Sequence, residues 1–388
     1  MRIRKTSHPF YGRAGSCPHT ADEVCACLPT LQETPDNLQQ FIEGDELYQA
    51  MLADIASAQQ RIQLESYIFA DDEIGRRFAT ALIKRAQAGV DVRVHIDAAG
   101  SLFLASRRLV HDLRRHRVRL RWFHRWSWRK PLRYNRRNHR KLLVVDEKFT
   151  YLGGFNIHRE SSQEVFGKDR WRDTHVRFEG LLAAQAAQLF DRFWRGDRRW
   201  MPPLTPDALS ELIPNHSRGC REQLRCIFTD MFAHAKHSIH LTTPYFVPDR
   251  RTQRLLKAAA NRGVDVRLLV PRKSDILLAR WAAQAAYAGL LDCGVRIYEY
   301  LPRMLHAKTI VVDGNYTTVG TANLDYRSFF LNYELNLFTR DSTLCSKLQA
   351  QFYTDLEAAE EINLKKWSRR FWGGRLFELA GWMARRWL

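Results

Sequence analysis

The sequence has 388 residues, 45% of them hydrophobic, which is enough for two folded domains with separate cores. No uninterrupted apolar run reaches the ~20 residues that span a bilayer. Lys and Arg number 61 against 42 Asp and Glu, a net charge of +19. This charge favours a polyanionic partner, either nucleic acid or an anionic membrane surface, and it does not distinguish between the two.

Hydrophobic periodicity predicts a first domain over residues 37–200. Residues 1–36 show no period, and we expect them to form an irregular N-terminal extension. Helices are expected at 37–59, 74–88, 106–119 and 181–194. Strands are expected at 62–69, 90–97, 141–146, 151–156 and 171–178. This order of strands and helices predicts a parallel sheet with crossover helices.

The second part of the chain repeats this plan after a segment with several prolines, 201–218, which we expect to link the two domains. The second domain is expected over 219–360. Its helices are expected at 222–236, 251–260, 275–291 and 342–359. Its strands are expected at 238–245, 264–271, 295–300, 308–312 and 333–339. The repetition indicates that the chain contains a duplicated domain.

A motif occurs once in each predicted domain and supports this duplication. Both copies have the pattern H-x-K-x4-D-x6-G-[GT]-x-N, in which x is any residue. The first copy contains His139, Lys141 and Asp146. The second copy contains His306, Lys308 and Asp313. Two copies with the same downstream Gly and Asn at the same offset are a strong signal, whereas a single copy could arise by chance.

Paired His and Lys residues suit the chemistry of a phosphodiester. Attack on this anion places more charge on the phosphoryl oxygens, which Lys141 and Lys308 are placed to neutralise. The amides of Asn156 and Asn323 can donate hydrogen bonds to the same oxygens. We expect one motif histidine to attack phosphorus, giving a phosphohistidine. The other is expected to protonate the leaving alcohol and then to deprotonate the acceptor.

The attacking histidine needs a carboxylate to hold its ring. Asp173 and Glu334 occupy matching places on matching predicted strands, so we expect them to orient the two histidines. Asp146 and Asp313 belong to the motif and therefore to the candidate catalytic set. Because they stand at the end of a strand, we expect them mainly to cap turns. No carboxylate cluster or His and Cys set suggests a metal, and no cofactor is expected.

Arginine and tryptophan are concentrated in the segment 120–140, which leads directly into His139. Indole rings suit a membrane interface and arginines suit phosphate, but stacking on nucleic acid bases would use the same side chains. Residues 361–388 contain four tryptophans among basic residues. This composition favours a tail that lies in a membrane interface over a helix packed on the domain core.

The paired motif resembles that of the phospholipase D superfamily. Further stretches resemble bacterial cardiolipin synthases, most closely those of type B: Leu64–Phe69, Trp171–Asp173, Thr243–Pro248 and Gly320–Glu334. The resemblance covers residues 38–360. It implies a duplicated α/β/α sandwich, with two halves related by a pseudo-two-fold axis and the active site at their interface. It also favours His139 as the nucleophile, with His306 as acid and base.

The reaction that this resemblance implies is transphosphatidylation. One phosphatidylglycerol forms a phosphatidyl-histidine and releases glycerol, and a second phosphatidylglycerol then attacks to give cardiolipin. The partner would be an anionic phospholipid membrane, with the protein bound peripherally to the cytoplasmic side of the bacterial inner membrane. Thr321 is expected to contact phosphate in place of the usual Ser of the family, whereas Gly154 has no hydroxyl to offer.

Two other functions fit part of the sequence pattern. A phosphodiesterase or nuclease of the same superfamily would also suit the net charge of +19. The terminal Trp and Arg residues and the stretch Arg327–Glu334 favour lipid, so nucleic acid is not expected as the partner. A membrane adaptor without catalysis is disfavoured because no position of either motif is lost.

Overall fold

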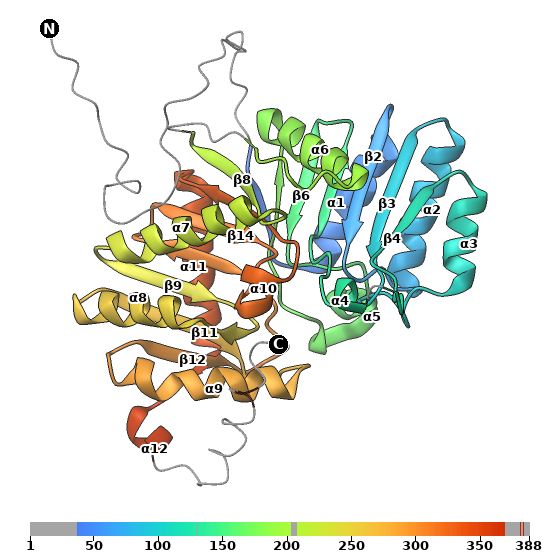
Figure 1. Cartoon of the computed structure of the whole chain (residues 1–388). Helices are drawn as coiled ribbons and strands as arrows, with labels where there is room; N and C mark the ends of the chain where they lie inside the picture. Colours follow the sequence, from blue (N-terminus) through green and yellow to red (C-terminus); the bar gives the residue numbers. More distant parts are fainter. Residues whose placement is uncertain (1–36, 130, 203–207, 369–380, 382, 384–388) are drawn as a thin grey trace, which may run out of the picture.

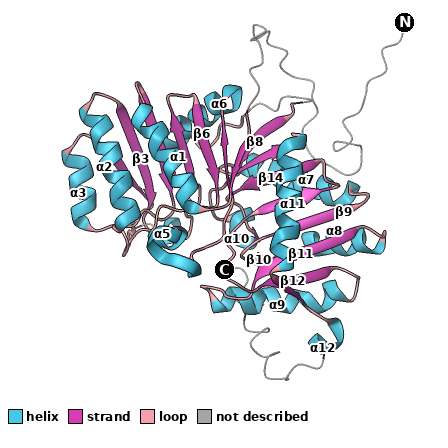
Figure 2. Ribbon diagram, turned by 180° about the vertical axis from the view of Figure 1, so that it is seen from behind, coloured by secondary structure: helices cyan, strands magenta, loops and turns pink. Residues whose placement is uncertain are grey.

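The computed structural model describes residues 37–129, 131–202, 208–368, 381 and 383. Over these residues the chain forms two α/β halves, each with a mixed sheet between helices (Figures 1 and 2). The first half is blue to green in Figure 1 and the second is yellow to red. The predicted extension 1–36 and most of the predicted tail 361–388 lie outside the described residues.

The sheet of the first half has seven strands in the order β1-β7-β6-β5-β2-β3-β4. Its strands are β1 (Gln39–Phe41), β2 (Arg61–Ser66), β3 (Asp91–Asp97), β4 (Arg119–Phe123), β5 (Leu142–Val145), β6 (Phe149–Gly153) and β7 (His175–Phe178). Strands β2, β3 and β4 are parallel, and the other neighbours are antiparallel. The helices are α1 (Gly44–Ser57), α2 (Glu73–Gln87), α3 (Arg107–Arg115), α4 (Pro131–Tyr134), α5 (Gln163–Phe166) and α6 (Gly180–Arg195).

The sheet of the second half has eight strands in the order β17-β12-β11-β9-β13-β14-β16-β8. Its strands are β8 (Ser210–Pro214), β9 (Ser238–Thr242), β11 (Asp265–Pro271), β12 (Arg296–Tyr300), β13 (Thr309–Val312), β14 (Tyr316–Gly320), β16 (Leu335–Thr339) and β17 (Ala359–Glu361). A separate pair joins β10 (Phe246–Val247) to β15 (Leu324–Asp325). The helices are α7 (Arg218–His234), α8 (Arg250–Asn261), α9 (Leu277–Leu291), α10 (Tyr326–Phe330), α11 (Ser342–Glu357) and α12 (Leu364–Ser368).

The two sheets have the same topology. Reading the second sheet from β8 to β12 gives the strand order of the first sheet, and only β17 is added at the far edge. In each half the strand that follows the H-x-K sequence, β5 or β13, lies beside the first parallel strand, β2 or β9. The predicted duplicated α/β sandwich is therefore confirmed. This equivalence also places the two motifs at corresponding positions of the two sheets.

Each half buries its own core, and a third core joins them. On α2, Ile74, Phe78 and Leu82 recur every four residues, so they share the helix face that packs on the sheet. Helices α7, α8 and α9 cover one face of the second sheet in the same way. Between the halves, α6 and α11 pack around side chains from both sheets, including Val144 and Val319. This shared core fixes how the two motifs face each other.

Several segments differ from the sequence prediction. Strands β4 and β14 were not predicted, and the helix expected at 106–119 ends at Arg115. The helix predicted at 37–59 begins only at Gly44, because Gln39–Phe41 pairs with β7 at the edge of the sheet. A side chain at Gly44 would also collide with the carbonyl of Ser161. The predicted linker 201–218 contains β8, which pairs with β16, and we propose to assign this strand to the second half.

The described part of the tail lies against α9. The Trp367 ring lies 5.3 Å from the Tyr287 ring, and a side chain at Gly381 would collide with the backbone of Trp281 and Ala282. These positions agree with the packed alternative for the tail, while most of the predicted membrane-interfacial segment lies outside the described residues. The free thiols include Cys220. Cys226, by contrast, is disulfide-bonded.

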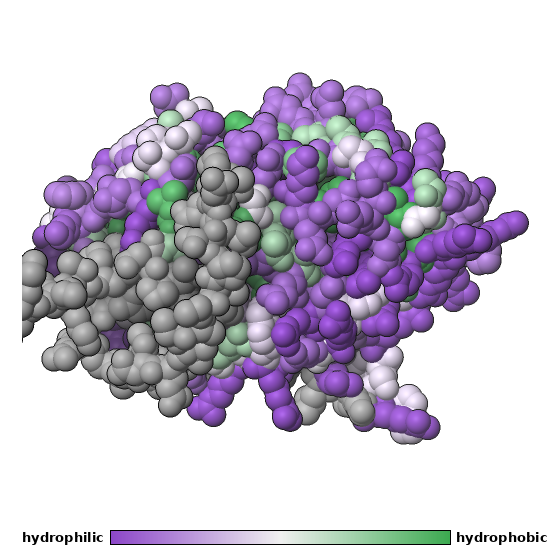
Figure 3. All heavy atoms as spheres, turned by 90° about the horizontal axis from the view of Figure 1, so that it is seen from above, coloured by the Kyte–Doolittle hydropathy of each residue, from purple (hydrophilic) through white to green (hydrophobic). Residues whose placement is uncertain are grey.

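The described surface seen from above is mainly hydrophilic, with small scattered apolar groups (Figure 3). Among the described helices, none combines the length and apolar character needed to cross a bilayer.

Candidate active site

The two H-x-K sequences enter the interface from the loops before β5 and β13. Each is held by the backbone of the opposite half. The amide of His139 donates to the carbonyl of Tyr333 at 2.9 Å, and that of His306 donates to the carbonyl of Arg172 at 2.7 Å. Because successive side chains of an extended segment alternate, each His and the Lys two positions later lie on the same side. The interface therefore receives two His and Lys pairs in a symmetric arrangement.

The carboxylates that pair with the histidines also come from the opposite half. Nδ1 of His139 lies 3.0 Å from Oε2 of Glu334, and Nδ1 of His306 lies 2.5 Å from Oδ2 of Asp173. All four side chains are buried. A carboxylate facing Nδ1 favours the tautomer with hydrogen on Nδ1, which leaves the Nε2 lone pair free to act. The structure thus brings together the histidines and the carboxylates predicted to orient them.

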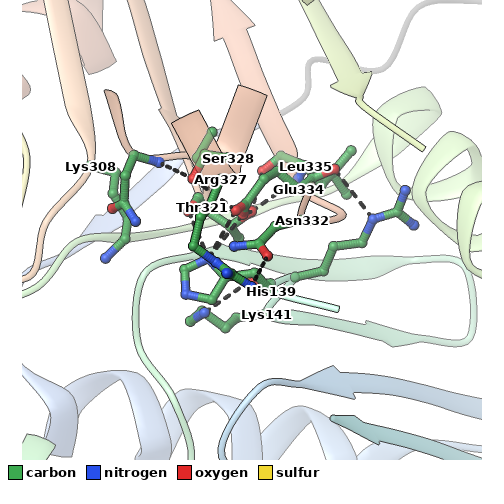
Figure 4. A network of polar contacts seen from close by, with 12 residues as sticks. His139, Lys141, Lys308, Thr321, Arg327, Ser328, Asn332, Glu334 and Leu335 are labelled. Carbon is green, nitrogen blue, oxygen red and sulfur yellow. Dashed lines mark hydrogen bonds and ion pairs between the residues drawn. The ribbon is translucent and has the colours of Figure 1, made fainter. Parts of the chain in front are cut away.

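Hydroxyl groups hold Glu334, and Figure 4 shows these contacts. Thr321 donates to Oε2 at 2.6 Å, and Ser328 donates to Oε1 at 3.0 Å. The hydroxyl proton of Thr321 is therefore given to this carboxylate, while its expected contact with phosphate stays a prediction. In the first half, a side chain at Gly154 would collide with the carboxylate of Asp173. Gly154 thus lies beside the shorter carboxylate side chain, Asp173, and Thr321 lies beside the longer one, Glu334.

Lys141 and Lys308 are buried between the two halves. Lys141 donates to the carbonyl of His139 at 2.8 Å, and Lys308 donates to the carbonyl of His306. Burial, followed by the charge of Lys308, lowers the pKa of Lys141 to about 7. Burial lowers the pKa of Lys308 to about 8, although Asp173 and Glu334 act in the opposite direction. An anion between these ammonium groups would compensate their charges.

Burial also controls the charge of the paired groups. It lowers the pKa of His306 to about 3 and lowers that of His139, so both rings are neutral at pH 7 in the empty site. Burial alone would raise the pKa of Asp173, but Lys308 and His306 hold it below its ordinary value. The histidine and lysines around Glu334 lower its pKa in the same way. The site therefore holds two ionised carboxylates and two neutral imidazoles.

Asn156 and Asn323 are buried at the ends of the two motifs. The Oδ1 atom of Asn156 accepts from the amide of Ile68 at 3.2 Å, which leaves its NH₂ group as the remaining donor. In the described part of the chain, Oδ1 of Asn323 has no hydrogen-bond partner. Buried polar atoms are normally paired, so this acceptor is suited to a hydroxyl group of a ligand, while the NH₂ group of the same amide can donate to a phosphoryl oxygen.

Asp146 and Asp313 lie outside the site. They follow the C-terminal ends of β5 and β13, while the histidines precede the other ends. The carboxylate of Asp146 accepts from the amides of Gln59, Gln60 and Arg61. Asp313 accepts from the corresponding amides of residues 236–238. Both residues therefore fix the turn before the first parallel strand, as the capping prediction proposed.

Sequence reasoning missed the middle residue of the first H-x-K sequence. Arg140 is fully buried, and its Nη1 lies 3.7 Å from Oε2 of Glu65. Its Nε donates to the carbonyl of Glu334 at 3.3 Å, and its guanidinium stacks 4.2 Å from the Phe193 ring. It ties β2 to the strand that carries the opposite carboxylate. The second copy has Ala307 at this place, and that asymmetry was the available signal.

Aromatic rings form part of the walls around both histidines. Tyr67 lies 5.0 Å from His139, and Trp171 lies 5.1 Å from His306, measured between ring centroids. In the second half the Tyr245 ring also lies near His306, with 6.5 Å between the ring centroids. Among the described residues, no group of three His, Cys, Asp or Glu side chains is arranged to hold a metal ion.

The lysine pKa values predict that anion binding weakens as pH rises. Below pH 7 both ammonium groups are already protonated, whereas above pH 8 an anion must draw protons onto Lys141 and Lys308. Sulfate does not titrate in this range, so its affinity should fall by about tenfold or more between pH 6 and pH 9. Calorimetric titrations in buffers of different ionisation enthalpy should detect proton uptake at pH 9. A sulfate affinity that is constant with pH would contradict the lowered lysine pKa values. The variant Lys141→Met should lose the part of the decrease in affinity that occurs near pH 7.

Two solved structures have a similar fold. The phosphatidylserine synthase of Haemophilus influenzae Rd KW20 matches with a TM-score of 0.70, at 14% identity over 90% of this chain and 95% of that one. The polyphosphate kinase of Porphyromonas gingivalis matches with a TM-score of 0.59, at 15% identity over 85% of this chain and 49% of that one. At these identities the likeness concerns the fold alone.

Two equivalent halves that place paired His and Lys residues at one interface agree with the phospholipase D superfamily, and the family match and relatives make the chain a phosphatidyltransferase of it. A family model described as "Cardiolipin synthase, PLD-like domain" matches residues 51–194 and 228–356, and the chain belongs to this family.

Curated relatives support the same family. Cardiolipin synthase 2 of Bacillus anthracis is 36% identical over 353 residues, covering 86% of this chain and 67% of the relative. The major cardiolipin synthase ClsA of Bacillus subtilis strain 168 is 35% identical over 352 residues, covering 87% and 72%. The cardiolipin synthase of Clostridium perfringens strain SM101 is 32% identical over 358 residues, covering 86% and 73%.

Proposed function

We propose that this protein is a cardiolipin synthase that moves a phosphatidyl group from one phosphatidylglycerol to another and releases glycerol. The observation that carries the proposal is the crossed pairing of His139 with Glu334 and of His306 with Asp173 at the interface. Each histidine is neutral, and the carboxylate at its Nδ1 leaves Nε2 free. Two such groups facing one site provide both a nucleophile and an acid–base partner for a double displacement.

In the first step Nε2 of His139 attacks phosphorus and the bond from phosphorus to the glycerol oxygen breaks. His306 gives its proton to that oxygen, so glycerol leaves as a neutral alcohol. For this step His306 must first be protonated, and the negative phosphate at the site supplies the charge that raises its pKa. In the second step His306 takes the proton from a hydroxyl of the second phosphatidylglycerol, whose oxygen attacks the phosphohistidine and frees His139.

Lys141 and Lys308 neutralise the phosphoryl oxygens during both steps, and Asn156 and Asn323 donate hydrogen bonds to them. The buried position of the two lysines strengthens this effect because little water screens their charge. Asp173 and Glu334 keep the rings aligned and stabilise the imidazolium that forms when a ring accepts a proton.

The substrate places the protein at an anionic phospholipid membrane. We propose peripheral attachment on the cytoplasmic side of the bacterial inner membrane, with the net charge of +19 favouring the anionic lipid surface. Nucleic acid is not part of the proposal. We also propose residues 37–200 and 219–360 as the two catalytic halves, the second of which is completed by strand β8 from the segment between them.

Purified protein mixed with phosphatidylglycerol vesicles and a chelator should form cardiolipin and glycerol in equal amounts, because the proposed steps use only side chains of this chain. Mass spectrometry of the lipid and an enzymatic assay of glycerol measure the two products. Vesicles of phosphatidylcholine alone should give no cardiolipin. Phosphatidic acid as the main product, or cleavage of DNA in place of lipid turnover, would contradict the proposal.

A further inference from the structure

An apolar tip projects from the first half beside the proposed active site. It consists of Leu102, Phe103 and Leu104, in the loop between β3 and α3, and Phe103 is 94% exposed. Three adjacent exposed hydrophobic side chains cost solvation free energy unless another surface covers them. The sequence prediction did not identify this tip, because it lies in the loop between β3 and α3, outside the periodic patterns that indicate helices and strands.

The tip is held in a fixed shape. The hydroxyl of Ser101, just before it, donates to the carbonyl of Tyr67 at 2.9 Å and accepts from the amide of Phe69 at 3.1 Å. The carbonyl of Leu104 accepts from the amide of Asp71 at 2.6 Å. The backbone under the exposed side chains is thus anchored on both sides, so that covering them requires little further ordering of the loop.

Arginines and aromatic rings surround a cavity of about 700 Å³ beside this tip. Its walls include Leu102, Arg107, Arg114, Arg125, Trp126 and Tyr134. Among the described residues, none of these three arginines has a carboxylate partner within salt-bridge distance. The Trp126 ring is 64% exposed and lies 5.3 Å from the Tyr134 ring, and Trp128 nearby is 77% exposed. The cavity therefore offers guanidinium groups that have no carboxylate partner among the described residues, beside an apolar rim.

The chain segment that carries this surface is almost entirely positive, and Asp71, which contacts its loop, is paired with Arg76. Residues 98–137 contain twelve arginines and one lysine, and Asp112 is their single acidic residue. Like charges of this density repel a second copy of the same surface. They attract phosphates, which arginine binds through its planar pair of donors.

The same loop touches the catalytic histidine through two short connections. The carboxylate of Asp97, at the start of the loop, accepts from the amide of Asn138, the residue before His139, at 2.8 Å. Gly100 packs so closely on Tyr67 that a side chain there would collide with it, and the Tyr67 ring lies against His139. In Figure 1, α4 lies at the lower edge of the first sheet, below β3 and β4. A membrane at this edge would therefore lie beside the site.

We propose that Leu102–Leu104, Trp126 and Trp128, together with Arg107, Arg114 and Arg125, form the surface by which this protein docks on an anionic phospholipid bilayer. The apolar tip and the indoles insert among the lipid chains, and the arginines hold lipid phosphates at the level of the headgroups. This docking surface deepens the proposed function and rests on it. Exposed Leu side chains favour a bilayer over nucleic acid, because they offer no plane for base stacking.

The test compares the double variant Leu102→Ser/Phe103→Ser with Leu181→Ser, which alters an exposed leucine on α6 of the same half. Both proteins, after their melting temperatures are checked, are sedimented with sucrose-loaded vesicles of phosphatidylglycerol and phosphatidylcholine. The double variant should bind these vesicles about tenfold more weakly than the wild type, whereas Leu181→Ser should not. The ratio of activity on vesicles to activity on monomeric short-chain phosphatidylglycerol should fall by a similar factor.

A second pair of variants tests the charges. Arg107→Gln/Arg114→Gln should lower vesicle binding about tenfold, whereas Arg251→Gln/Arg254→Gln, which removes two exposed arginines from α8, should change it less than twofold. Vesicle binding that is unchanged in both docking variants would overturn the surface. If Arg107→Gln/Arg114→Gln weakened the binding of a DNA oligonucleotide but not of vesicles, the surface would bind nucleic acid and the docking proposal would be overturned. Wild-type protein that binds vesicles but makes no cardiolipin from either lipid form would refute the function and leave the docking surface standing.

Discussion

Cardiolipin formation is expected to fall by about 10⁶ in kcat when His139 is replaced by Ala, because removing a covalent nucleophile ends the double displacement. The effect of His306→Ala should be smaller, about 10² to 10⁴, since a general acid and base is lost while the nucleophile remains. Both rings are buried and face carboxylates of the opposite half, so water cannot readily take either role. Rates should be measured by mass spectrometry of the lipid product.

The trapped intermediate separates the two roles. Acid-sensitive phosphate should be found on His139 in wild type, and should accumulate in His306→Ala when the leaving group is made more acidic than glycerol. His234→Ala, which alters an exposed histidine at the end of α7, is the matched control and should turn over normally. Phosphate recovered on His306, or turnover of His139→Ala within tenfold of wild type, would reverse or defeat the assignment.

The motif, the duplication and the identity of the orienting carboxylates could all be predicted from sequence. Asp173 and Glu334 stand at equivalent offsets in two similar strands, and that symmetry is visible without coordinates. Which histidine each one serves could not be predicted. The crossed pairing depends on how the halves pack through the core around α6 and α11, and the spacing of residues along the chain carries no information on that.

Several residues have contacts in the structure that local sequence patterns do not predict. Thr321 was predicted to contact phosphate because of its place in the motif, yet its hydroxyl supports Glu334. The contrast with Gly154, which leaves room for the shorter Asp173, was present in the sequence but gains meaning only when strand neighbours are known. Likewise Gln39–Phe41 pairs as an edge strand because a partner strand lies beside it, and tertiary pairing overrides helical periodicity.

The second large effect is expected at Asp173. Its Oδ1 accepts from the amide of Thr174 at 2.8 Å, and its Oδ2 faces Nδ1 of His306 at 2.5 Å. In Asp173→Asn the backbone amide still requires an acceptor, so the oxygen stays at that place and the NH₂ group turns toward His306. The ring must then accept at Nδ1 and carry its hydrogen on Nε2, the tautomer that cannot act as a base. A loss of about 10⁴ in kcat is expected.

Glu334→Gln should lower kcat less than Asp173→Asn does, and the difference between the two variants tests whether the carboxylate controls the tautomer of its histidine. Both carboxylate oxygens of Glu334 lie near Nδ1 of His139, at 3.0 and 3.1 Å, and its other neighbours are hydroxyls that can donate or accept. The amide oxygen can therefore still face the ring, so only the charge is lost, and a fall of about 10 to 10² in kcat is expected.

The matched control for both is Asp146→Asn, at the far end of β5. It loses an acceptor for the backbone amides of residues 59–61 and should cost about 1–3 kcal/mol of stability while leaving kcat unchanged. Asp173→Asn also removes a charge that raises the pKa of Lys308, so the alkaline limb of its pH–rate profile should move to lower pH. Equal losses in Asp173→Asn and Glu334→Gln, with no movement of that limb, would show that the carboxylates act through charge or packing alone, without control of the tautomer.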